Sequence, residues 1–153
     1  MNSLELKIPP PVVGLCFAVV MWLTPSIAGT LHLSLGLRIA LAIAIVVLGQ
    51  SISVSGMVEF RRARTTINPI HANKASSLVT GGIYRFTRNP MYLGLLFTLL
   101  GWAAYLANPV TLLFLPLFVL YIDRFQIRPE ERVLEALFGA RYSAYAGKVR
   151  WWL

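Results

Sequence analysis

Charged side chains are scarce in this sequence, and those present are unevenly spaced. Asp, Glu, Lys and Arg make up 13% of the 153 residues, whereas 57% of the residues are hydrophobic. Ordinary soluble domains have about 25% charged and about 45–50% apolar residues. Residues 8–58 contain one charged residue, Arg38, and residues 89–122 contain none. This composition excludes a disordered chain and disfavours a soluble fold.

Cysteine and histidine are also nearly absent. The single cysteine, Cys16, cannot form an intrachain disulfide, and we expect it to behave as a small apolar residue. The two histidines, His32 and His71, are expected to be structural or solvated. The sequence predicts no metal site. It also lacks the basic segment and cleavage site of a removable signal peptide, so we expect the first apolar segment to be retained.

The uncharged stretches are long enough to cross a bilayer. A helix rises about 1.5 Å per residue, so roughly 20 apolar residues cross about 30 Å of hydrocarbon. We therefore predict an all-α fold in one domain, an integral membrane bundle of four transmembrane helices with a cytoplasmic C-terminal helical tail. The predicted parts are spans at about 10–30, 34–57, 90–107 and 109–126, a cytoplasmic loop over 61–88 and a tail over 127–153.

Positive charges lie at the edges of these spans. Six of the 14 Lys and Arg residues lie in residues 59–88 and six follow residue 122, whereas the connections near 30–36 and at Asn108-Pro109 carry none. Cytoplasmic loops collect Lys and Arg, so both termini are predicted to be cytoplasmic. Because the net charge of +8 forms no continuous basic face, we expect membrane lipids rather than nucleic acid as partners.

Proline and glycine residues mark the expected helix ends. Pro25 should kink the first span or end it early, and Pro90 suits the first turn of the third span. Pro129 is predicted to begin a separate helix that stops at Gly139. Small residues also suit contacts between helices of two chains, so the oligomeric state stays open. These residues are Gly36, Gly49 and Gly56.

Two polar cytoplasmic segments carry the candidate chemistry, and the hairpin of the third and fourth spans brings them together. The first, residues 78–94, reads LVTGGIYRFTRNPMYLG. Its glycines allow close approach of the backbone to a ligand, and its tyrosines offer faces for stacking. An interfacial turn with no ligand is the alternative interpretation.

The second segment contains the acidic pair Glu130 and Glu131. Neighbouring helical residues point about 100° apart, so we expect one of the pair to face a ligand and the other to pair with Arg128 or Arg132. A favourable interaction with the helix dipole is the simpler alternative. Farther along, a short helix from Arg141 to about Lys148 is expected to bring two tyrosines together, and two tryptophans end the chain as interfacial anchors.

The first segment, followed after a helical hairpin by PEERVLEALFGARYSAY, resembles the isoprenylcysteine carboxyl methyltransferase and phospholipid methyltransferase superfamily. The stretch Thr65-Thr66-Ile67-Asn68-Pro69 is similar to bacterial members, and the resemblance covers about residues 63–150. It implies an integral membrane methyltransferase of the bacterial inner membrane. It also implies S-adenosyl-L-methionine as cofactor, bound between helix ends and the cytoplasmic tail.

Carried over position by position, the resemblance implies a set of cofactor-binding residues. Asn89 stands where the superfamily motif R-H-P-x-Y has histidine, and it cannot act as a general base because Asn does not titrate near neutral pH. Arg124 is the nearest counterpart of superfamily arginines that contact the substrate carboxylate, and Arg88 is a second candidate for holding an anionic group. The implied cofactor-binding residues are Leu78, Val79, Tyr84, Asn89, Pro90, Tyr92, Glu130 and Glu131.

The methyl acceptor is expected to be a lipophilic small molecule or lipid-linked substrate that enters from the bilayer. A carboxylate of isoprenylcysteine type is favoured because methyl transfer to a carboxylate needs no base, whereas a thiol or amine would need one. A phospholipid amine, a small thiol and another hydrophobic acid stay open. So do a non-catalytic binding module and a nicotinamide-dependent reductase, since some membrane sterol reductases share a related helical architecture.

Overall fold

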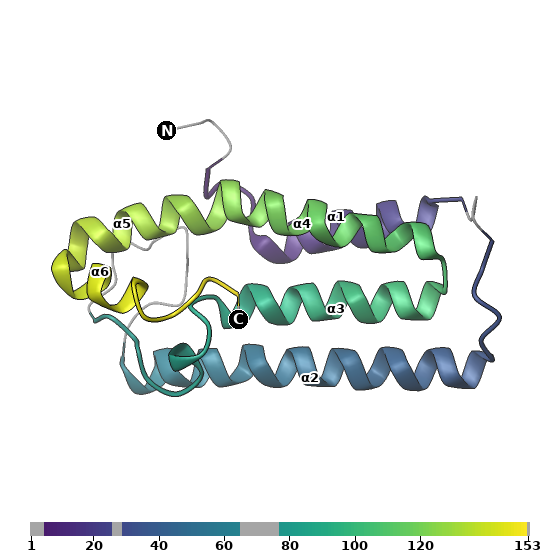
Figure 1. Ribbon diagram of the computed structural model, residues 1–153, viewed down its shortest axis with the longest axis horizontal. Coiled ribbons are helices and arrows are strands. Elements are labelled where there is room, and N and C mark those ends of the chain that lie inside the picture. Colours follow the sequence, from purple (N-terminus) through teal and green to yellow (C-terminus); the bar gives the residue numbers. More distant parts are fainter. Residues whose placement is uncertain (1–4, 26–28, 65–76, 153) are drawn as a thin grey trace.

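The computed structural model describes residues 5–25, 29–64 and 77–152. All regular structure in these ranges is helical, which confirms the predicted all-α class (Figure 1). The α-helices are α1 (Pro10–Leu23), α2 (Leu35–Arg62), α3 (Pro90–Leu106), α4 (Phe114–Ile122), α5 (Arg128–Phe138) and α6 (Ala140–Ala146). The shorter turns are η2 (Gly82–Arg85), η3 (Pro109–Leu113) and the π-helical turn η4 (Asp123–Ile127).

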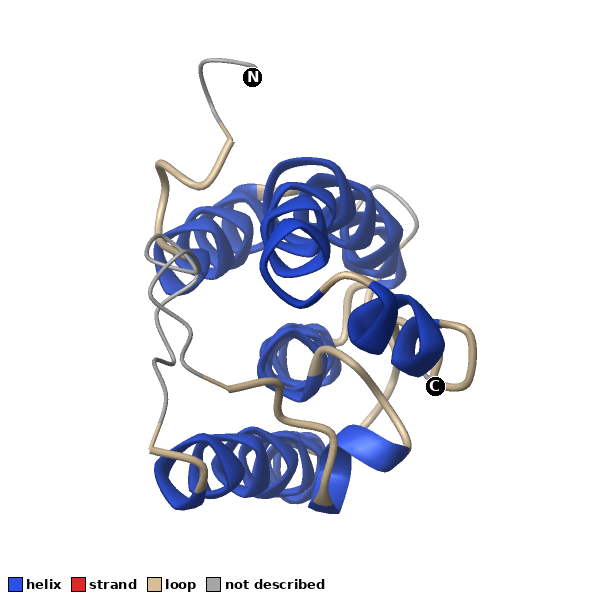
Figure 2. Cartoon of the chain, turned by 90° about the vertical axis from the view of Figure 1, so that its left-hand side faces the viewer, coloured by secondary structure: helices blue, strands red, loops and turns tan. Residues whose placement is uncertain are grey.

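Helix α3 lies at the centre of the bundle, with α2 on one side and α1 and α4 on the other (Figures 1 and 2). The core on the α1–α4 side is formed by buried apolar side chains, including Met21, Leu99, Phe118 and Ile122. η2, α5, α6 and the C-terminal segment gather at one end of the bundle, on the left in Figure 1. The two polar segments singled out in the sequence therefore meet, as predicted.

Small residues let α2 and α3 approach closely. A Cβ atom at Gly94 of α3 would overlap both the Ser53 hydroxyl and the Gly49 carbonyl oxygen of α2, and Gly56 packs in the same way against the start of α3. Close backbone contact at such small residues is a common packing mode of membrane helices. Gly49 and Gly56 thus serve contacts within the chain rather than the dimer contact considered above, whereas Gly36 faces open space.

Two helical segments are long and apolar enough to cross a bilayer, α2 and the continuous run Pro109–Phe138. Helices α1 and α3 are shorter, with 14 and 17 residues. α1 ends at Leu23, well before the predicted end at residue 30, because Thr24 precedes a proline and takes an extended conformation. Two of the four predicted spans are therefore long enough to cross a bilayer, and the crossings by α1 and α3 stay a prediction.

The fourth helix does not end where the sequence predicted. Helices α4 and α5 are joined through η4 into one helical run, so Pro129 lies inside a long helix rather than starting a separate one. The widened π turn just before Pro129 accommodates a residue that has no backbone N–H to donate. The 30 residues of Pro109–Phe138 exceed what about 30 Å of hydrocarbon requires, so a crossing by this run would leave room for the charged α5 outside the hydrocarbon. Gly139, with φ +51°, ends α5 as predicted.

Apolar side chains cover the outside of the bundle. Leu15 on α1 and Ile43 and Val47 on α2 are between 58% and 65% exposed, as lipid-facing residues of a membrane helix would be. At the opposite end from α5, Arg38 does not extend freely: its Nε donates to the carbonyl oxygen of Tyr105, at 2.7 Å. The charge of Arg38 is therefore held at the C-terminal end of α3, where helix dipoles favour cations.

Candidate functional site

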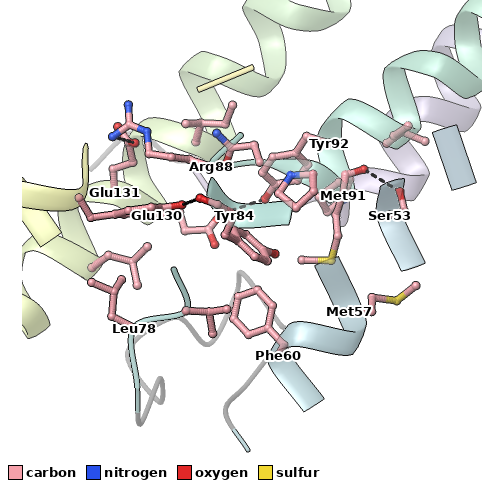
Figure 3. Close-up of a pocket in the computed structure, with 18 of the residues that line it drawn as sticks. Ser53, Met57, Phe60, Leu78, Tyr84, Arg88, Met91, Tyr92, Glu130 and Glu131 are labelled. Atoms are coloured by element: carbon pink, nitrogen blue, oxygen red, sulfur yellow. Dashed lines mark hydrogen bonds and ion pairs between the residues drawn. The ribbon is translucent and has the colours of Figure 1, made fainter. Parts of the chain in front are cut away.

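A cavity of about 660 Å³ lies where η2, the start of α3, α5 and α6 meet α2 and the start of α1 (Figure 3). Cavities of about 300–1,000 Å³ hold small-molecule ligands. The eight residues expected to bind a cofactor all line this cavity, together with Arg88; they are Leu78, Val79, Tyr84, Asn89, Pro90, Tyr92, Glu130 and Glu131. Residues 38 to 53 positions apart in sequence, from Tyr92 and Glu130 to Leu78 and Glu131, are thus brought into one site.

The acidic pair is divided between two hydrogen-bond networks. The Tyr92 hydroxyl donates to Glu130 Oε2 at 3.1 Å. Glu131 Oε1 lies 2.9 Å from Nη1 of Arg88 and accepts from the Tyr142 hydroxyl at 2.7 Å. Among the described residues, Glu131 therefore has an arginine partner and Glu130 does not, as the 100° spacing of neighbouring helical residues led us to expect.

The arginine partner of Glu131 differs from the two predicted from the sequence. Arg128 pairs with Asp123 at 2.8 Å, and Arg132 pairs with Glu5 at 2.6 Å. Glu5 also lies 3.4 Å from Arg124, so the N-terminal segment takes up two of the cations that follow α4. The Arg124 side chain is 45% exposed and does not line the cavity. The structure therefore does not bring Arg124 to the other predicted site residues.

Asn89 lies where the chain end meets the start of α3. Its side-chain amide and the Thr87 hydroxyl both donate to the carbonyl oxygen of Trp151, each at 3.0 Å. The backbone N–H of Arg88 donates to the carbonyl oxygen of Arg150 at 3.0 Å. Asn89 thus fastens the C-terminal segment to the turn that carries Arg88. No local pattern in the sequence indicates this contact.

The end of the cavity away from Arg88 and Glu131 is largely apolar, although Gln50 and Ser53 of α2 also line the cavity. Met57 and Phe60 of α2 form part of this wall, and the Phe60 ring packs edge-on against Tyr84 with 5.4 Å between ring centroids (Figure 3). Residues of α1 and its approach complete it: Pro9, Pro10 and Pro11. The sequence interpretation missed these residues because one apolar helix residue looks like another until packing decides which face is turned inward.

Comparison with known proteins identifies the family. The profile of the phospholipid methyltransferase family matches residues 37–141. The chain belongs to this family. The match begins in α2 and ends in α6, so it includes η2, the α3–α4 hairpin and the acidic pair, as the sequence resemblance predicted.

Similar individual proteins include one uncharacterized bacterial protein and two eukaryotic methyltransferases. An uncharacterized protein of Haemophilus influenzae is 48% identical over 63 residues, which are 41% of this chain and all of that protein. A probable protein-S-isoprenylcysteine O-methyltransferase of Oryza sativa is 34% identical over 110 residues, 70% of this chain and 56% of the rice protein. The corresponding Schizosaccharomyces pombe enzyme is 34% identical over 108 residues, 71% and 46% of the two chains. The chain thus matches about half the length of these two methyltransferases.

Within this family member, the cavity environment sets the charge of Glu130. The pKa of the Glu130 carboxyl is raised to about 7, chiefly by burial; the hydrogen bond from Tyr92 lowers this pKa and the charge of the neighbouring Glu131 raises it. Burial also raises the pKa of the Tyr84 hydroxyl well above its usual range, so Tyr84 stays neutral. Glu130 therefore gains or loses its charge near neutral pH.

Proposed function

We propose that this protein is an integral membrane methyltransferase that uses S-adenosyl-L-methionine and methylates a lipophilic carboxylate of isoprenylcysteine type. One observation carries the proposal: a single cavity has carboxylates and an arginine at one end and apolar residues of α1 and α2 at the other. Such a cavity suits a polar methyl donor beside a lipophilic acceptor. The rice and fission yeast relatives, which are named as isoprenylcysteine O-methyltransferases, support this acceptor class.

The residues of the polar end fit the proposed cofactor. S-adenosyl-L-methionine supplies an electrophilic methyl group on a sulfonium, and it carries an ammonium, a carboxylate and a ribose diol. Glu130 and Glu131 offer acceptors for the ammonium or the diol. Tyr84 and Tyr92 offer aromatic faces for adenine or the sulfonium. Leu78 and Val79 add an apolar wall beside them.

Arg88 is the candidate for holding the acceptor carboxylate, because it is the cation among the described residues that line the cavity. A guanidinium binds a carboxylate through two parallel hydrogen bonds. Met57, Phe60 and Leu95 give the cavity an apolar wall, and a carboxylate beside such a wall would be less solvated and more reactive than in water. No proton has to leave a carboxylate acceptor, so the asparagine at position 89 is no obstacle to this reaction.

We expect Arg88→Lys to lower turnover at least tenfold, because an ammonium does not reproduce the two parallel hydrogen bonds of a guanidinium. Arg124→Lys makes the same change outside the cavity and should leave turnover within about twofold. The turnover of both variants is measured as the steady-state rate of methylation of a prenylated cysteine derivative. Loss of turnover in Arg124→Lys with normal turnover in Arg88→Lys would assign the acceptor to Arg124 instead.

The product identifies the acceptor chemistry. The purified protein is incubated with methyl-labelled S-adenosyl-L-methionine and an N-acyl-S-prenylcysteine, and the product is then treated with alkali. A methyl ester releases labelled methanol under these conditions, whereas an N-methyl or S-methyl product retains its label. Alkali-labile label supports a carboxylate acceptor, and alkali-stable label on this substrate contradicts it.

A phospholipid amine is the second candidate acceptor. Glu130, with a pKa of about 7, has the proton affinity that suits a general base near neutral pH, and an amine acceptor must lose a proton. The same labelling assay, run with phosphatidylethanolamine, would then give alkali-stable label in the lipid fraction. Label on the prenylcysteine supports the carboxylate acceptor, and label on phosphatidylethanolamine supports the amine acceptor.

The pKa of Glu130 predicts how cofactor affinity changes with pH. A ligand ammonium or hydroxyl that donates to Glu130 binds the ionised carboxylate, so lowering the pH below about 7 protonates Glu130 and weakens binding. Affinity for S-adenosylhomocysteine should rise roughly tenfold between pH 6 and pH 8. Titration calorimetry at both pH values measures this rise, and Glu130→Gln should abolish it. An equal rise in Glu130→Gln would assign the pH dependence to another group.

The proposal places both termini and the cavity on the cytoplasmic side of the membrane. In a variant whose Cys16 is replaced by serine, a cysteine at the exposed position 32, between α1 and α2, should react with an impermeant reagent added to intact cells. A cysteine at the exposed position 148, after α6, should not react until the cells are opened. The reverse pattern would place the cavity outside and contradict a cytoplasmic cofactor site.

A further inference from the structure

A second cavity, of about 520 Å³, lies at the chain end and shares only Arg88 with the first one. Its lining holds three cations, Arg88, Lys148 and Arg150, and none of its lining residues is acidic. Lys148 and Arg150 are exposed, and neither side chain forms an ion pair with the described parts of the chain. Because Arg88 already pairs with Glu131, the surplus of positive charge at this cavity comes from Lys148 and Arg150.

Two buried hydrogen-bond donors in this lining lack an acceptor. They are Nε of Arg88 and the indole Nε1 of Trp151, which find no partner within residues 5–25, 29–64 and 77–152. The Arg88 guanidinium carbon lies 5.7 Å from the centroid of the Trp151 ring, so the two groups are neighbours. Buried donors in folded proteins nearly always find a partner, and both donors belong to side chains of residues that line this cavity.

We propose that this second cavity binds a phosphate group, such as the headgroup phosphate of an anionic phospholipid. Phosphate oxygens accept strong hydrogen bonds from guanidinium and ammonium groups. The cavity lies beside the start of α3, and its lining includes Trp151 and Trp152, residues that concentrate at the membrane surface. The ligand is neither methyl donor nor acceptor, so this inference does not depend on the proposed enzymatic activity.

The geometry also gives the phosphate a structural effect. Trp151 accepts hydrogen bonds from Thr87 and Asn89, and Arg150 accepts one from the backbone of Arg88. A phosphate bound by the same C-terminal segment would hold that segment against the turn that carries Arg88. Phosphate binding is therefore expected to stabilise the end of the bundle where the first cavity lies.

The test uses the purified full chain in a neutral, phosphate-free detergent. Two probes are titrated by calorimetry: inorganic phosphate and dihexanoyl phosphatidylglycerol, a soluble phospholipid. Binding is compared between the unmodified chain, Lys148→Gln/Arg150→Gln, and the matched control Arg61→Gln/Arg141→Gln. The control removes two other exposed cations from the same end of the bundle. Labelling the four tryptophans with 5-fluorotryptophan, with Trp151→Phe to assign the signal, reports the indole environment directly.

We expect at least one probe to bind, to shift the Trp151 resonance, and to bind at least tenfold more weakly to Lys148→Gln/Arg150→Gln than to the control. Binding of the phospholipid alone identifies a lipid headgroup site, and competition by inorganic phosphate identifies a general phosphate site. Unchanged S-adenosylhomocysteine affinity of the double variant shows that it is folded. The absence of binding by both probes, or equal weakening in the control, overturns the proposal.

Discussion

Replacing Glu130 and Glu131 together by glutamine is expected to lower the affinity for S-adenosylhomocysteine at least tenfold while the protein stays folded. Both side chains line the cavity and carry hydrogen bonds within it, and glutamine keeps their shape but removes their charge. Charge-assisted hydrogen bonds contribute about 1.5–3 kcal/mol each, whereas a surface interaction with the helix dipole contributes about 0.3–1 kcal/mol. Calorimetry with the purified variant measures the difference.

Glu135→Gln is the matched control for this variant. Glu135 lies on the same helix, is exposed and does not line the cavity, so its replacement should leave affinity unchanged. The single variants assign the loss. Glu130→Gln removes the acid that has no arginine partner in the described part of the chain, and Glu131→Gln also removes the ion pair with Arg88. An unchanged affinity in the double variant would show that Glu130 and Glu131 do not bind the cofactor, and would favour the alternative that they only stabilise the start of the helix.

A second large effect is expected from Gly94→Ala at the contact between α2 and α3. The added Cβ atom would overlap the Gly49 carbonyl oxygen and the Ser53 hydroxyl. The side chain of Ser53 can rotate away, but the backbone oxygen cannot. Overpacking of this kind costs about 1–3 kcal/mol, and it moves α2, which carries Met57 and Phe60, away from the rest of the cavity. A thermal unfolding scan should show a melting temperature lowered by several degrees.

Gly36→Ala, in α2, provides the opposite case. No atom lies within 4 Å of a Cβ at Gly36, and alanine is favoured over glycine inside a helix by roughly 0.5–1 kcal/mol. This variant should therefore be unchanged or slightly more stable. If Gly94→Ala were as stable as Gly36→Ala, close contact of the two backbones would not be what holds α2 against α3.

The residues of the polar end were predictable because they lie in short, continuous segments. Leu78 to Tyr92 and the acidic pair are recognised by local spacing, and the α3–α4 hairpin between them brings their ends together whatever the details of packing. The helix end at Gly139 followed from the same local chemistry. Pro25 and Pro129 show the limit, because both lack a backbone N–H donor. Pro25 lies just beyond the end of α1, whereas Pro129 lies inside a continuous helical run, directly after a π turn.

Contacts between distant segments could not be predicted. Arg124 was a reasonable acceptor residue by its place after the last span, but Glu5, more than a hundred residues earlier, pairs with it. The partner of Glu131 was likewise expected on its own helix and lies instead on the turn before α3. Ion pairs of this kind depend on which helix faces meet, and the near-uniform apolar sequence of the spans carries no signal for that choice.

The central claim is that the cavity between α2, α3 and α5 binds S-adenosyl-L-methionine. Titration calorimetry of the purified chain with S-adenosylhomocysteine, and separately with NADPH, tests it most directly, because a methyltransferase, a reductase and a non-catalytic binding module differ in which of the two they bind. We predict saturable binding of S-adenosylhomocysteine, no binding of NADPH, and competition between S-adenosylhomocysteine and S-adenosyl-L-methionine. Binding of NADPH, or no binding of S-adenosylhomocysteine by folded protein, would contradict the account.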